Sequence, residues 1–141
     1  MTAPRQMVLD WLSAKLAELV GDEGEFEINP SGDPSRFPAV SIEESDQDAD
    51  DQTEPGSTRY DLSLGIEGYV EGGNGPEATA ARSDLYEAVL AACFDPEGRP
   101  DCIEEIREGG MRMATTILAE ARRLGFNLTV TFRFVVARPT A

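Results

Sequence analysis

Residues 127–136 read NLTVTFRFVV, and this stretch decides the fold class because apolar and polar residues alternate along it. Every even position in it is apolar, whereas the odd positions include Thr129, Thr131 and Arg133. A period of two is typical of a β-strand with one face buried and the other in water. We therefore expect a strand over 127–137 in an antiparallel sheet that is covered on one face.

The same alternation occurs earlier in the chain, over residues 60–71. The apolar side chains there share one parity and are Tyr60, Leu62, Leu64, Ile66 and Val70. A further strand is predicted over 37–42, and a short edge strand within the acidic stretch 22–29. The simplest topology is a long hairpin in which the strand near 37–43 pairs with the one at 59–71.

Two segments have the apolar spacing of amphipathic helices. The first covers residues 4–20, with spacings of 4, 4 and 3 between Val8, Leu12, Leu16 and Leu19. The second runs from Pro76 to Phe94, with spacings of 3, 4, 4 and 3 between Ala78, Ala81, Leu85, Val89 and Ala92. Both segments are therefore predicted to be helices that bury one stripe.

Residues 112–124 fit two patterns. A helical stripe ended by Gly125 would consist of Met113, Ile117, Ala121 and Leu124, and this spacing favours a helix. The β-branched residues 115–117 favour a strand that pairs back onto 127–137. We expect a single α+β domain over residues 1–141, with an antiparallel sheet packed by two helices, or by three if 112–124 is helical.

The segment 43–57 reads EESDQDADDQTEPGS and is predicted to be a solvated acidic loop within that domain. Its seven acids are Glu43, Glu44, Asp46, Asp48, Asp50, Asp51 and Glu54, and it contains no base. Three of these aspartates match the first positions of a calcium loop, but the required glycine and bidentate glutamate are replaced by Asp51 and Ser57. A weak divalent site and a simply solvated loop both remain open, and we favour the solvated loop.

Composition excludes most catalytic designs. The chain has no histidine, which removes histidine-based nucleophile activation and imidazole zinc sites. It also lacks a phosphate-binding loop, and its single lysine is Lys15 on the first predicted helix. With 12 Lys+Arg against 27 Asp+Glu, the net charge of −15 argues against binding nucleic acid through its phosphates. We expect a protein that is not an enzyme and needs no cofactor.

The two cysteines, Cys93 and Cys102, are expected to stay reduced. The N-terminus runs into an amphipathic segment and resembles neither a signal peptide nor a membrane span, so we expect a cytoplasmic protein without membrane contact. Thiols in such a compartment are normally kept reduced.

Several residues are candidates for a protein–protein surface. Tyr69 and Val135 lie on the outward parity of their strands. Met111 and Arg112 follow the pair Gly109-Gly110, which favours either a segment that orders on contact or a simple turn with one methionine packed inward.

Charge is also distributed unevenly. Residues 22–54 hold twelve acids against the single base Arg36, while 127–141 holds Arg133 and Arg138 and no acid. The uneven charge favours contact between copies of the chain, in which the acidic part of one subunit meets the basic edge of the next. The alternative is that charges are divided over the surface by chance.

The order of these elements resembles the tail-terminator, or tail-completion, proteins of long-tailed bacteriophages. The resemblance is carried by Val8-Leu9-Asp10-Trp11-Leu12, Phe37-Pro38-Ala39-Val40, Tyr60-Asp61-Leu62-Ser63-Leu64 and Thr129-Val130-Thr131-Phe132-Arg133-Phe134. It implies a non-enzymatic virion protein of the tail or neck, assembled in the host cytoplasm. Members form a hexameric ring that caps the tail tube and docks the tail to the head.

The resemblance also has implications for partners and contacts. Partners would be further copies of the chain, the tail tube protein and a head–tail connector protein, and DNA would pass through the ring without specific binding. Val40 and Ile42, on the strand at 37–43, would lie where neighbouring subunits abut, and the acidic loop would face the lumen or an adjoining ring. The resemblance also implies a sheet of four or more strands. Residues 112–121 would then be a strand, although their apolar spacing favours a helix.

Two other functions compete with this one. A head–tail connector or stopper belongs to the same class. An acidic cytoplasmic protein-binding module, for example a nucleic-acid mimic, belongs to another class and would be monomeric or dimeric.

Overall fold

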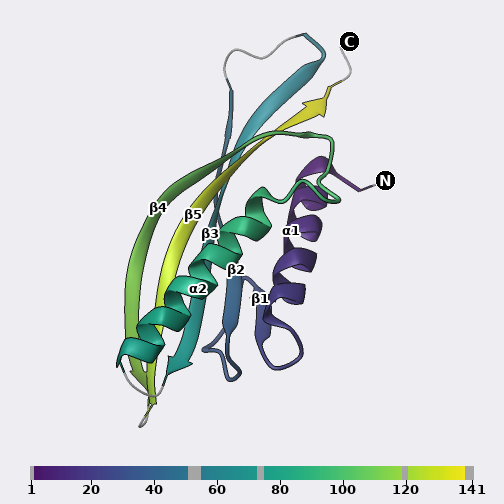
Figure 1. The fold of residues 1–141 in the computed structure, drawn as a ribbon. Coiled ribbons are helices and arrows are strands. Elements are labelled where there is room, and N and C mark those ends of the chain that lie inside the picture. Colours follow the sequence, from purple (N-terminus) through teal and green to yellow (C-terminus); the bar gives the residue numbers. More distant parts are fainter. Residues whose placement is uncertain (1, 51–54, 73–74, 119–120, 139–141) are drawn as a thin grey trace.

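The computed structural model describes residues 2–50, 55–72, 75–118 and 121–138, which form two helices and a five-stranded sheet (Figure 1). The elements are α1 (Pro4–Val20), β1 (Glu25–Ile28), β2 (Ala39–Ala49), β3 (Ser57–Gly72), α2 (Gly75–Phe94), β4 (Ile103–Leu118) and β5 (Ala121–Ala137). The strand order is β1-β2-β3-β5-β4. Only β1 and β2 are parallel, and the other neighbours are antiparallel. The predicted α+β class is therefore confirmed.

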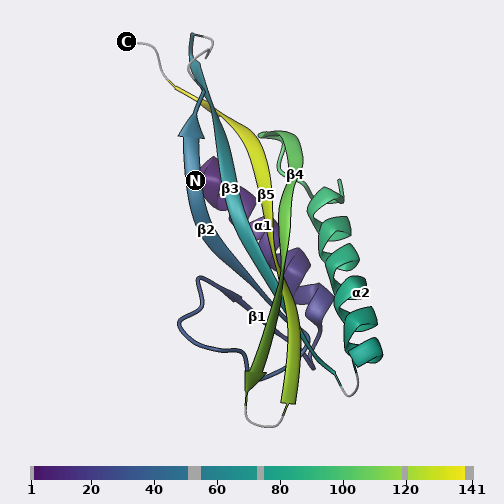
Figure 2. The ribbon, with the colours of Figure 1, turned by 90° about the vertical axis from the view of Figure 1, so that its left-hand side faces the viewer.

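Both helices lie on one face of the sheet, and β4 and β5 bow around α2 (Figure 1). Figure 2 looks onto the other face, with α1 behind the strands. The even positions of β3 and β5 point toward the helices, and Leu64, Ile66, Leu128 and Val130 are fully buried there. Apolar residues of α1 and α2 complete one core, and no described polar or charged side chain is buried in it.

Side-chain contacts join α1 to β5 and to the turn that follows α2. The indole of Trp11 meets Phe132 edge-on with a ring-centroid separation of 6.5 Å, and its Nε1 donates to the Glu97 carbonyl at 3.0 Å. The Lys15 ammonium lies 2.8 Å from an Asp95 carboxylate oxygen. The middle of α1 is thereby joined to the segment that follows the C-terminal end of α2.

The helix favoured over 112–124 is wrong, and the strand alternative is confirmed. Residues 103–118 form β4, which pairs with β5 from Ile106 opposite Phe132 to Leu118 opposite Ala121. Gly125 does not end a helix: a Cβ there would lie 2.5 Å from the Tyr69 ring and 2.6 Å from a backbone oxygen of β3. This glycine therefore allows β5 and β3 to approach, and strand pairing overrides the helical spacing.

Residues 43–49 of the acidic segment are strand, so the prediction of a loop over 43–57 is wrong for that part. β2 continues to Ala49 and β3 begins at Ser57, which leaves only residues 50–56 between them. Pairing needs only backbone groups, so Asp48 lies opposite Asp61 in the ladder while the side chains of 43–49 remain exposed. The predicted hairpin with β3 is confirmed from Ala39, and a register shift follows Glu44.

Candidate assembly surface

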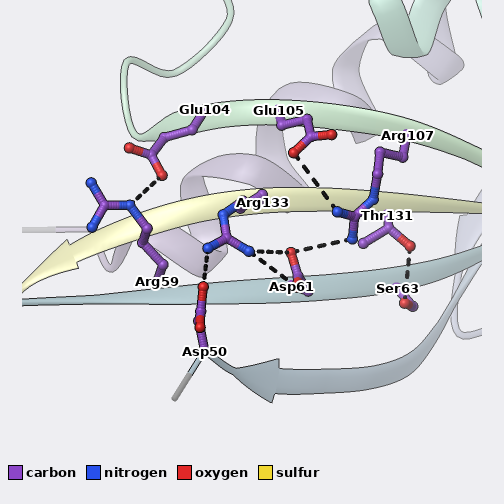
Figure 3. Close-up of polar contacts among 9 residues, drawn as sticks. All are labelled: Asp50, Arg59, Asp61, Ser63, Glu104, Glu105, Arg107, Thr131 and Arg133. Atoms are coloured by element: carbon purple, nitrogen blue, oxygen red, sulfur yellow. Dashed lines mark hydrogen bonds and ion pairs between the residues drawn. The ribbon is translucent and has the colours of Figure 1, made fainter. Parts of the chain in front are cut away.

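The face of the sheet opposite the helices is largely polar, and no described helix or strand covers it. It is formed by the odd positions of β3 and β5, which alternate with the buried ones. At its centre the Ser63 and Thr131 hydroxyls are 3.1 Å apart across β3 and β5 (Figure 3). We call this the open face, and it divides into an end where charges are paired and an end where acids gather.

A network of ion pairs occupies the first end (Figure 3). Arg133 on β5 binds Asp50 at the end of β2, and its Nη1 lies 3.3 Å from each carboxylate oxygen of Asp61 on β3. Arg107 on β4 approaches the same Asp61 at 3.4 Å and Glu105 at 3.7 Å. The network thus joins four neighbouring strands through side chains.

A second pair extends this network toward the strand ends. The Arg59 Nε of β3 donates to a Glu104 carboxylate oxygen of β4 at 2.7 Å, across the intervening strand β5 (Figure 3). Asp50 and then Asp61 raise the pKa of Arg133, because both carboxylates favour its charged form. The arginines at this end are therefore neutralised within the chain.

The acidic end of the open face is hollowed. The hollow has a volume of about 290 Å³ and lies between β1, β2, β3 and the segment 30–34. Its charged residues are Glu25, Glu27, Asp33, Glu43 and Glu67, and Tyr69 contributes an aromatic wall. Among the residues that the structure describes, no lysine or arginine lines it.

Crowding of these acids changes their titration. Partial burial, and then the charge of Glu43, raise the pKa of Glu67. Partial burial also raises the pKa of Tyr69, and Glu67, Asp33 and Glu43 raise it further. The Asn127 amide, which donates to Glu67 at 3.4 Å, is neutral and so compensates little. A cation entering the hollow would therefore find unbalanced negative charge.

Glu44, next along β2, is balanced instead. The Asn29 amide donates to it at 2.8 Å, and the Arg5 guanidinium of α1 forms an ion pair with it. These contacts, with the Asn29 hydrogen bond as the larger, lower the pKa of Glu44. Glu44 therefore holds β2 against α1 and the turn after β1.

The predicted surface residues are not brought together. Val40 and Ile42 are buried under the helices, so their assignment to a subunit surface is wrong in this chain. Tyr69 lines the hollow and Val135 is half-buried on the open face. Arg133 belongs to the ion-pair network and is not a free basic edge.

The methionine–arginine segment 111–113 is part of β4 and not a turn. A register shift between Glu108 and Met111 accommodates Gly109-Gly110 as a bulge. Met111 packs against the core opposite Leu128, whereas Arg112 is exposed opposite Asn127. Only Arg112 of this pair is therefore available to a partner.

The seven acidic residues of the segment 43–57 fall into three groups in the structure. Glu43, Glu44, Asp46 and Asp48 are exposed on β2, Asp50 is paired with Arg133, and Asp51 and Glu54 lie outside the described residues. Because 46 and 48 are strand positions, they do not form the loop that a calcium site requires. Within the described ranges, no group of three or more metal-ligating side chains is placed to hold a metal ion.

Sequence reasoning missed both the hollow and the ion-pair network. The parity of Glu67 and Tyr69 placed them on the outward face, but their acidic neighbours on β1 and the segment 30–34 are distant in sequence. Arg133 and its partner Asp61 are 72 positions apart. Only the strand order, which no local pattern contains, brings these groups together.

Neither cysteine is arranged for reactivity. Cys93 and Cys102 are free thiols, and burial raises the pKa of Cys93 to about 12.

None of the described helices is both long and apolar enough to span a membrane. No protein-family model matches this chain, and no curated protein matches it either.

Proposed function

We propose that this chain is a structural subunit of a phage-tail ring, of the tail-terminator type that the sequence resembles. Its task would be to cap the tail tube and to present a docking ring to the head. The partners would be further copies of the chain, the tail tube protein and a connector protein. Such work requires extended surfaces rather than catalytic groups.

The observation that carries this proposal is the strand at 112–118. Helical spacing predicted a helix there, whereas the family resemblance required a strand to complete a sheet of four or more strands. The chain has β4 at this position, in a five-stranded sheet. The resemblance therefore predicted a strand where the local pattern predicted a helix. The presence of the strand supports the proposal.

The arrangement of faces also supports a role in assembly. The helices cover one face of the sheet and leave the open face and two edge strands available to other molecules. An acidic protein through which DNA passes would repel phosphate, in keeping with the net charge of −15. We place the exposed acids of 43–48 on the lumen or against an adjoining ring.

The test is the solution mass of the purified chain by light scattering, followed by negative-stain imaging. Six copies of a 15.3 kDa chain would have a mass of about 92 kDa, and imaging should show rings with a central opening. The measurement is made at high protein concentration in low and high salt, on the order of 0.05 M and 0.35 M. A chain that remains monomeric or dimeric under both conditions would contradict the proposal. Affinity capture with tail or neck preparations then separates a terminator from a connector or stopper.

One observation favours a second candidate, an acidic protein-binding module. The described lining of the hollow beside Glu67 contains acids and no base, and it suits a lysine or arginine of a partner. A binding module would be monomeric or dimeric and would bind a basic protein through the hollow. The same mass measurement therefore distinguishes the two functions.

A further inference from the structure

The two edges of the sheet differ in charge. Residues 109–141 contain five arginines and one acid, a net charge of +4 within a chain of −15, so residues 1–108 carry −19. Of this part, only residues 109–118 lie on the edge strand β4, and Arg112 is their one charged residue. The first half of β4 instead holds three glutamates and one arginine, and β5 is an inner strand. β1 and β2, at the other edge, belong to the acidic part. The far half of the β4 edge is therefore basic, whereas the β1 edge is acidic.

The β4 edge has unpaired backbone, and its far half carries Arg112. β4 is 16 residues long and pairs with β5 on one side only, within the part of the chain that the structure describes. Such an edge is a template for another strand. Near its far end Met113 is 63% exposed, and Arg112 has no ion pair or hydrogen bond with a described residue.

The acidic edge is β1, which pairs only with β2 among the described strands. Glu27 is exposed there and lacks a cationic partner within the described ranges, and Ile28 beside it is 41% exposed. Each edge thus combines one unpaired charge with one exposed apolar side chain, and the two charges are opposite in sign.

The two edges are also level with each other. The ladders place Glu27 opposite Ser41, Glu67, Asn127 and finally Arg112, in one row across all five strands on the open face. The strand directions in these ladders make β1 antiparallel to β4. A second copy translated along the row would therefore bring its β1 beside β4 in the antiparallel sense, with opposite charges facing.

We propose that β4 of one subunit pairs with β1 of a second copy, so that Arg112 faces the neighbour's Glu27 and the sheet continues from subunit to subunit. This inference rests on the proposed ring function and specifies the contact that closes the ring. The contact is head-to-tail, with a different surface on each side, which is the kind that generates rings. The acids of the hollow lie behind Glu27 and add to the attraction for the incoming arginine.

The test is a pair of charge reversals, Arg112→Glu and Glu27→Arg, measured by light scattering and analytical ultracentrifugation. Each variant alone places like charges on both sides of the contact, so self-association should weaken at least about tenfold and rings should be lost. An equimolar mixture should restore rings, because each variant then meets an opposite charge on both sides. The double variant should form rings by itself.

Matched controls carry the same charge changes elsewhere. Glu18→Arg on α1 and Arg82→Glu on α2 alter net charge equally but lie on the helices, outside the row from Glu27 to Arg112, and they should assemble like the wild type. Circular dichroism of each single variant, together with rescue on mixing, separates loss of assembly from loss of folding.

The outcomes distinguish this inference from the function on which it rests. Wild-type rings that persist in both single variants, or single variants that do not reassemble on mixing, overturn the β4–β1 contact and leave the ring function in place. A wild-type chain that stays monomeric at every concentration overturns both.

Discussion

The two faces of the same strands differ completely, although their residues alternate one by one. On β5, Leu128 is 0% exposed beneath the helices, while Thr129 beside it is exposed on the open face. The covered face is apolar and supplies the hydrophobic stabilisation that holds the sheet to the helices. The open face contributes little burial, so its side chains are free to determine which surfaces attract one another.

A second difference separates the two ends of the open face. Around Arg133 each cation has an acid from another strand, whereas the hollow around Glu67 collects acids alone. The first end binds the strands of one molecule together. The second retains charge that only another molecule can balance.

The largest effect should come from placing a charge on the covered face. Leu128→Asp buries an unpaired carboxylate and should cost more than about 4 kcal/mol, enough to unfold the chain. Thr129→Asp, one residue along on the open face, should change the free energy of unfolding by no more than about 0.5 kcal/mol. Denaturant unfolding followed by circular dichroism measures both, and similar losses in the two variants would show that the faces are assigned incorrectly.

Adding one methyl group should sharpen the same contrast. A Cβ on Gly68 would lie 2.5 Å from Cζ of Phe126 on the covered face, whereas the nearest atoms to a Cβ on Gly65 of the open face are 3.7 Å away. Gly68→Ala should therefore cost about 1–3 kcal/mol through overpacking. Gly65→Ala should stay within about 0.5 kcal/mol of the wild type, because its Cβ meets only ordinary contacts. Thermal melts of the two variants would refute this difference if their midpoints coincided.

Removing the central cation of the ion-pair network should have a smaller effect. Arg133→Met leaves Asp50 and Asp61 without their shared partner and should lower the free energy of unfolding by less than either covered-face substitution above, because exposed ion pairs contribute little to stability. The loss should shrink in about 1 M salt, where charges are screened. Arg82→Met, the matched change on α2, should leave stability unchanged. A loss in Arg133→Met that does not depend on salt would assign its role to packing.

The smallest effect concerns Glu67 and depends on pH. Its pKa is raised in the folded chain, so the native state binds more protons than the unfolded state between the ordinary value and the raised one. Stability therefore falls as pH rises through that interval, and Glu67→Gln should raise the melting temperature at pH 7 by about 2 °C or less. Below the ordinary pKa of the carboxyl the two proteins should melt alike. A variant that is less stable than the wild type at pH 7 would contradict this sign.

Local periodicity predicted the elements whose own side chains decide their burial. The two helices and the strands at β3 and β5 were correct because each buries a stripe or a face that is readable over a few residues. The sequence 112–124 misled because its apolar residues have helical spacing, while the decisive contact is the close approach of Gly125 to Tyr69 on another strand. That contact is invisible until β3 and β5 are paired.

The prediction of a loop over the acidic segment 43–57 was wrong in part for a related reason. Composition correctly indicated that residues 43–49 have nothing to bury, and their side chains are exposed. It said nothing about the backbone, which pairs with β3 because β3 is long enough to extend past the core. Exposure of side chains and absence of secondary structure are separate properties.

The sequence by itself determined the α+β class, the helices, the covered face and the strong negative charge, because these follow from residue type and local period. Only the tertiary structure decided the strand order and, through it, the pairing of Arg133 with Asp50 and Asp61, the acidic hollow, and the row from Glu27 to Arg112. Register between strands far apart in the chain depends on packing against a common core, and no short stretch of sequence encodes it.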